Sequence, residues 1–112
     1  MEKNSEAKKI NILITFGTRP EGIKLAPIIK EIENNSDRFN LIICSTGQHK
    51  EMLNQVLNFF EIKPNIFFNL MTGDQSLAFL SSKILVEMNN ILSKFTPDIL
   101  LIQGDTATAF LT

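Results

Sequence analysis

The chain has 112 residues, 44% of them hydrophobic, so it can bury a core of its own and corresponds to one domain or part of one. Its 11 basic and 12 acidic residues give a net charge of −1, which excludes the strong positive field expected of a partner for nucleic acid or an anionic membrane. The apolar runs are only a few residues long, which excludes a membrane-spanning helix of about 20 residues.

The amino-terminal segment divides into a tail and a strand. Residues 1–9 are polar and charged and lack the apolar stretch of a signal peptide, so we expect a disordered tail. Residues 10–16 (INILITF) form a branched apolar run that ends at Gly17. Such a run is typical of a parallel strand buried on both faces.

A helix is predicted directly after this strand. Pro20 and Glu21 suit a first helical turn, and apolar residues at helical spacing continue the pattern to about Asn34. Pro27 lies inside the pattern, where it removes a hydrogen bond and crowds the preceding turn. The sequence therefore predicts a kink or a helix that restarts at Pro27.

The same alternation continues to the end of the chain. Apolar strands are predicted at 40–45, 66–70 and 99–103, and helices at 52–60 and 77–94. The single cysteine, Cys44, lies within an apolar strand, cannot form an intrachain disulfide and fits a reducing cytoplasm. The β-α-β-α-β-α-β order predicts an α/β fold, a Rossmann-like parallel sheet with helices on both faces.

The connectivity predicts where a ligand binds. Right-handed crossovers and the common 3-2-1-4 strand order place strand 10–16 beside strand 99–103. Ligands of such sheets bind beyond the carboxyl ends of the strands where the order reverses, here between residues 17–21 and 104–106. Because the chain stops soon after strand 99–103, we expect residues 10–112 to be a partial domain whose last strand is an open edge.

Residues 17–21 (GTRPE) are the first candidate site. Gly17 permits a close approach, the helix start offers amides, and Arg19 carries a permanent charge, a combination that suits a phosphate. The alternative is a plain tight turn with a solvated arginine. Lys24 would add a second cation to the same ligand or be an ordinary solvated helix lysine.

Two further polar positions follow predicted strands. Asp105 would face the same crevice as a general acid or base, or it would simply cap the next helix. His49, the sole histidine, would take part in catalysis or would be a structural hydrogen-bonding residue at a helix start. The chain has no cysteine and histidine cluster for a metal and no recognisable Ser-His-Asp spacing.

Several strings together resemble the non-hydrolysing UDP-N-acetylglucosamine 2-epimerases over roughly residues 10–112. The strings are FGTRPE at 16–21, IK at 23–24, AP at 26–27, GQH at 47–49, EMLNQVL at 51–57, GDQSL at 73–77 and QGDT at 103–106. Hydrolysing relatives usually carry GSRAE and GDR instead, so Pro20 and Thr106 favour the non-hydrolysing branch.

The resemblance implies a glycosyltransferase-B-like fold of two Rossmann-type halves with a UDP-sugar between them, of which this chain is the amino-terminal half. It implies an isomerase that interconverts UDP-N-acetylglucosamine and UDP-N-acetylmannosamine by eliminating and re-adding UDP, with no redox cofactor and no metal. Gly17, Arg19 and Lys24 would then bind UDP, and Asp105 together with Lys24 would serve catalysis.

The resemblance also implies a second, activating UDP-N-acetylglucosamine site near Gln48, His49 and Gln75. Two positions depart from the family there, since Asp74 stands where members often have arginine and Glu51 where some have glutamine.

The resemblance further implies that the full-length enzyme is a homodimer. The remaining catalytic residues of the family would fall after residue 112, so the 112-residue chain alone is expected to be inactive. Two other functions remain open, a stand-alone nucleotide-binding or regulatory module and half of a related UDP-sugar glycosyltransferase.

Overall fold

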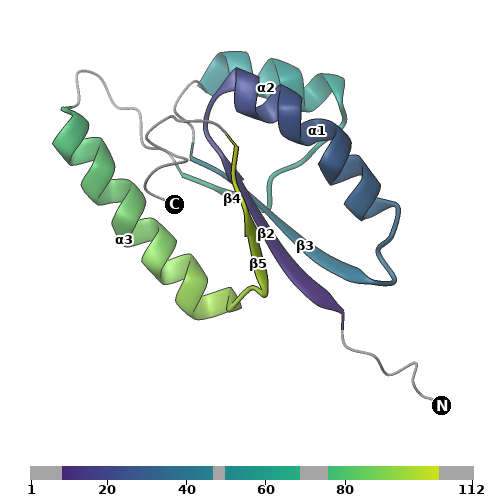
Figure 1. The fold of residues 1–112 in the computed structure, drawn as a ribbon. Helices are drawn as coiled ribbons and strands as arrows, with labels where there is room; N and C mark the ends of the chain where they lie inside the picture. Colours follow the sequence, from purple (N-terminus) through teal and green to yellow (C-terminus); the bar gives the residue numbers. More distant parts are fainter. Residues whose placement is uncertain (1–8, 47–49, 69–75, 104–112) are drawn as a thin grey trace.

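The computed structural model describes residues 9–46, 50–68 and 76–103 (Figure 1). Its elements are β2 (Ile10–Phe16), α1 (Arg19–Glu33), β3 (Phe39–Ser45), α2 (Lys50–Phe59), β4 (Ile66–Phe67), α3 (Leu77–Phe95) and β5 (Ile99–Leu101). All strand pairs are parallel, and the order across the sheet is β4-β3-β2-β5. The predicted α/β class and the predicted strand order are both confirmed.

Strand β2 is the centre of the sheet. It pairs with β3 along its full length, from Ile10 opposite Phe39 to Phe16 opposite Ser45, and with β5 at residues 12–14. Helices α1 and α2 cover one face of the sheet and α3 covers the other (Figure 1). A central strand with helices on both faces buries successive side chains, which explains why β2 is mostly apolar, with Asn11 and Thr15 as its polar residues.

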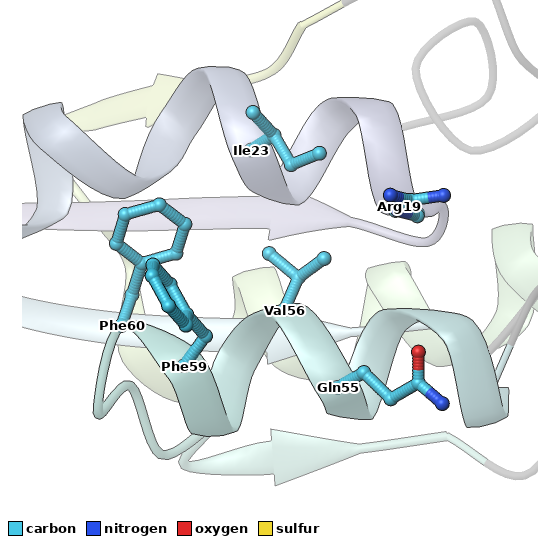
Figure 2. A pocket seen from close by; sticks show the side chains of 6 residues that line it. All are labelled: Arg19, Ile23, Gln55, Val56, Phe59 and Phe60. Carbon is cyan, nitrogen blue, oxygen red and sulfur yellow. The ribbon is translucent and has the colours of Figure 1, made fainter.

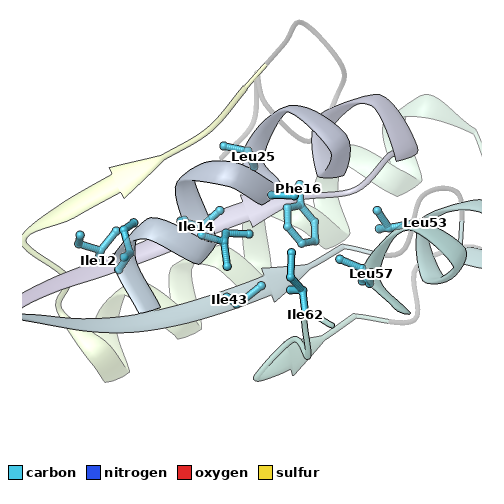
Figure 3. Close-up of a cluster of buried hydrophobic side chains, with 11 residues drawn as sticks. Ile12, Ile14, Phe16, Leu25, Ile43, Leu53, Leu57 and Ile62 are labelled. Atoms are coloured by element: carbon cyan, nitrogen blue, oxygen red, sulfur yellow. The ribbon is translucent and has the colours of Figure 1, made fainter. Parts of the chain in front are cut away.

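The sheet separates two apolar clusters. Ile12, Ile14 and Phe16 of β2 point toward α1 and α2, whereas Leu13 points toward α3. The first cluster also contains Leu25, Ala26, Ile29, Ile32, Ile43, Leu53, Leu57 and Ile62 (Figure 3). The second contains Cys44, Phe68, Ile84, Met88 and Ile91. Successive strand residues therefore stabilise opposite layers.

Some predicted boundaries were wrong. Helix α1 runs through Pro27 as one element, so a restart at Pro27 is wrong, and the alternative, a kink there, stays a prediction. Pro27 and Ile23, whose carbonyl the proline leaves without its usual donor, are both exposed, so water can replace the lost bond. Strand β5 ends at Leu101, short of the predicted Gln103, because its ladder with β2 ends where Leu101 pairs with Ile14.

Defined local features mark both ends of α3 and the start of β5. Ser76 accepts a hydrogen bond from the Phe79 N–H at 3.0 Å, and Thr96 ends the helix in the left-handed conformation with φ 40°. Asp98 then exchanges two hydrogen bonds of 2.8 Å with the Asn11 backbone, one through its carboxylate and one through its N–H. The predicted stop at residues 96–98 is confirmed.

Within the described segments, no helix combines the length and apolarity needed to cross a membrane. The predicted tail falls mostly on residues 1–8, which lie outside the described residues.

Candidate functional site

The loop between β2 and α1 is the best-defined part of the site. Gly17 and Thr18 are buried where β2 ends, and Thr18 is the extended residue before the helix, with φ −125° and ψ 163°. Pro20 stands in the first turn of α1, where its missing N–H costs no helical hydrogen bond. The loop therefore turns directly from the central strand into the helix.

A buried carboxylate closes this loop from inside. Glu21 is 2% exposed, and its Oε1 accepts hydrogen bonds from the N–H groups of Gly17 at 2.8 Å and Thr18 at 3.2 Å. An acid at the third helical position that reaches back to the helix start is the carboxylate half of a capping box. The expectation that amides are available for phosphate at this helix start is therefore wrong for Gly17 and Thr18.

The positively charged side chains of the site are exposed. Arg19 and Lys24 are both exposed, and neither forms an ion pair or hydrogen bond with any other described residue. Their positions on α1 differ by about 140° around the axis, because each residue advances a helix by about 100°. A ligand shared by both must therefore lie over the amino-terminal end of α1, where both flexible side chains can reach.

A groove of about 310 Å³ separates α1 from α2 beside this loop. Arg19 lies at one end and the rings of Phe59 and Phe60 at the other (Figure 2). The two rings meet edge to face with centroids 5.1 Å apart, and Phe59 is 80% exposed. The sequence pattern did not predict this groove, although the apolar pair at the end of a helix was a sign of it.

Gly22 allows the two helices to approach each other. A Cβ atom at this position would lie 2.8 Å from the Leu53 Cδ1 atom and 3.7 Å from the Val56 Cγ1 atom of α2. The first distance is shorter than any normal contact between carbon atoms. The absence of a side chain at Gly22 therefore sets the spacing of the helices beside the loop.

The other predicted site residues lie outside the described part of the chain. These are Asp105, which follows β5 in the sequence, together with Gln48, His49 and Gln75. Strands β2 and β5, which precede Gly17 and Asp105 in the sequence, are hydrogen-bonded neighbours. The predicted adjacency of the first and last strands is therefore confirmed, but the position of Asp105 stays a prediction.

The thiol of the single cysteine is expected to be unreactive. Cys44 is fully buried against α3, and burial, with a smaller effect from the nearby charge of Glu87, raises the pKa of its thiol to about 12. No group of three His, Cys, Asp or Glu side chains suited to a metal occurs within residues 9–46, 50–68 and 76–103.

The strand order and the two helical layers define a doubly wound α/β domain, the class that binds ligands beyond the carboxyl ends of its strands. The family model described as UDP-N-acetylglucosamine 2-epimerase matches residues 30–112. The chain belongs to this family.

Individual relatives agree with this assignment. The UDP-N-acetylglucosamine 2-epimerase of Campylobacter jejuni is 52% identical over 101 residues, covering 90% of this chain and 26% of the relative. The structure of the Neisseria meningitidis enzyme bound to UDP-GlcNAc matches with a TM-score of 0.85 and 42% identity, over 91% of this chain and 27% of that one. A Methanocaldococcus jannaschii enzyme in complex with UDP-GlcNAc and UDP matches with a TM-score of 0.79 and 31% identity, over 88% and 27%. The chain thus spans about a quarter of the length of its relatives.

Proposed function

We propose that this chain contributes to a UDP-N-acetylglucosamine 2-epimerase, an isomerase that interconverts UDP-N-acetylglucosamine and UDP-N-acetylmannosamine. The observation that carries the proposal is family membership together with a cation-bearing loop at the carboxyl end of the central strand. The similar enzymes from Neisseria meningitidis and Methanocaldococcus jannaschii, whose structures hold UDP-GlcNAc, support the substrate class.

The proposed reaction begins when C2 of the sugar loses its proton and the bond from C1 to the UDP oxygen breaks. The products of this step are an unsaturated sugar and UDP. Re-addition of UDP at C1, with return of a proton to C2 from the opposite face, gives the epimer. The reaction therefore needs groups that stabilise the departing diphosphate and a group that moves a proton.

Residues of this chain fit the diphosphate part of that task. Arg19 and Lys24 would bind the diphosphate through charge-assisted hydrogen bonds, and Lys24 would also offset the charge that develops as UDP departs. Gly17 would keep the loop close to the ligand because it has no side chain. Asp105 would serve as the proton-transfer or orienting carboxylate of the same crevice.

The test is UDP binding to the complete gene product that carries this chain. Arg19→Ala should weaken UDP binding by roughly 10-fold or more, because a hydrogen bond to a charged group contributes about 1.5–3 kcal/mol. Arg38→Ala is the matched control, since Arg38 is exposed and lies at the opposite, amino-terminal end of β3 against Phe39. Equal affinities of the two variants, measured by titration calorimetry, would contradict the role of Arg19.

The wider proposal includes a cytoplasmic homodimer that needs no added cofactor. A second UDP-N-acetylglucosamine molecule would bind near Gln48, His49 and Gln75 and activate the enzyme. A dimer measured by light scattering, and a rate that rises with substrate more steeply than one site allows, are the expected results.

A further inference from the structure

The carboxylate of Glu21, in the first turn of α1, is bonded to the loop between β2 and α1. Among the residues that the structure describes, it is the one charged side chain that is buried. Burying a carboxylate is costly unless hydrogen bonds replace its water. Here Oε1 accepts hydrogen bonds from the N–H groups of Gly17 and Thr18. These bonds offset the cost of burying the carboxylate and fix the conformation of the loop.

These bonds change what the loop can offer to an anion. The N–H groups of Gly17 and Thr18 are occupied, Pro20 has none, and the N–H of Gly22 donates to the Thr18 carbonyl at 3.0 Å. The carboxylate also offsets the partial positive charge that a helix start normally presents. The N–H groups of Gly17 and Thr18 are therefore not available to a diphosphate, which makes the exposed side chain of Arg19 more important for attracting one.

Arg19 is the exposed side chain that directly follows the two occupied amides. It directly follows Thr18, whose backbone the Glu21 carboxylate holds, and it is exposed at the end of the groove between α1 and α2 (Figure 2). A guanidinium binds phosphate well only when its planar fork is correctly directed. A shift of the backbone at Thr18 would redirect Arg19 without removing any group that touches the ligand.

We propose that Glu21 is a positioning residue for diphosphate binding, and that its carboxylate stays on the Gly17 and Thr18 amides while UDP is bound. This inference rests on the proposed function, because it assumes that Arg19 contacts the diphosphate. The opposite arrangement is a carboxylate that only fills the amide site until a phosphate displaces it. The two arrangements predict opposite effects of substitutions at Glu21.

The experiment measures the dissociation constant of UDP in the complete gene product for Glu21→Gln, Glu21→Asp, Arg19→Ala and the double variant Glu21→Asp/Arg19→Ala. Glu21→Gln should bind within about 3-fold of the unmodified protein, because its amide oxygen accepts the same two bonds at the same reach. Glu21→Asp keeps the charge but is one methylene too short, and should bind about 10-fold more weakly.

The double variant separates positioning from general structure. If Glu21 acts through Arg19, the double variant should bind no more than about 2-fold more weakly than Arg19→Ala, because effects through one shared contact do not add. Fully additive losses would overturn the proposal, as would UDP binding by Glu21→Asp at the unmodified affinity. Circular dichroism checks that each variant is folded.

Glu21→Gln keeps the test decisive if Glu21→Asp does not fold. An affinity for UDP about 10-fold higher than that of the unmodified protein would show a displaced carboxylate and overturn the proposal, because a neutral amide competes less well with phosphate. An affinity about 10-fold lower would also overturn it. An unchanged affinity in Arg19→Ala would instead contradict the proposed function itself, whatever the results at Glu21.

Discussion

Replacing Gly22 with valine tests how closely α1 and α2 must pack beside the site. Helix propensity alone predicts a gain of a few tenths of a kcal/mol, because valine is a better helix former than glycine. The structure predicts the opposite sign, since the new Cβ would lie 2.8 Å from Cδ1 of Leu53, a side chain with 0% exposure. Overpacking of a core costs about 1–3 kcal/mol, so the net effect should be a loss of about 1–2 kcal/mol.

Urea unfolding followed by circular dichroism measures this loss. With a slope of about 2 kcal/mol per molar urea, the midpoint for Gly22→Val should fall by roughly 0.5–1 M. Leu53→Ala provides the matched test, because it removes the atom that the new side chain meets. In the double variant the two losses should therefore not add. A Gly22→Val protein as stable as the unmodified one would refute the close-packing argument.

Two more predictions concern the buried thiol of Cys44 and a part-buried hydrogen bond of the sheet. Cys44, whose pKa is raised to about 12 from 9.0, keeps its proton in the folded state above pH 9, so stability should fall from pH 9 to pH 12 by up to about 1.4 kcal/mol per unit. Urea unfolding of Cys44→Ala should lack this component, and rapid thiol labelling of the native protein at pH 8 would contradict the burial. Asn65→Ala should cost about 1–3 kcal/mol, because the Ile43 N–H donates to Asn65 Oδ1 at 2.7 Å and would lose its acceptor. Asn65→Asp keeps an acceptor and is the control, and equal urea midpoints for Asn65→Ala and the unmodified protein would rule out the contribution.

The sheet was predictable from the sequence because its signals are local and repeated. Most of strand β2 is buried on both faces, so five of its seven residues are apolar and the pattern is visible without any partner. The turn at residues 96–98 was also visible, because a proline there cannot continue a helix. Strand order followed from the preference for right-handed crossovers, a general property of parallel sheets.

The details of the site were less predictable. The motif at residues 17–21 indicated an anion site, but the pattern could not show that Glu21 turns back onto the Gly17 and Thr18 amides. The same motif is equally compatible with an exposed acidic side chain in the first helical turn. The restart expected at Pro27 was wrong for a related reason, since the cost of a proline inside a helix depends on whether water reaches the carbonyl that it leaves without a donor.

The α/β class and the strand order follow from the amino-acid sequence alone, because apolar periodicity and connectivity are properties of the chain, whereas the site after the first strand stays a prediction. Which groups of the loop are occupied and which are exposed depends on the packing of the folded chain. The carboxylate of Glu21 saturates two buried amides, and Gly22 brings α2 against α1, through contacts that depend on the relative positions of packed elements. Those contacts leave Arg19 and Lys24 as the exposed charges of the site.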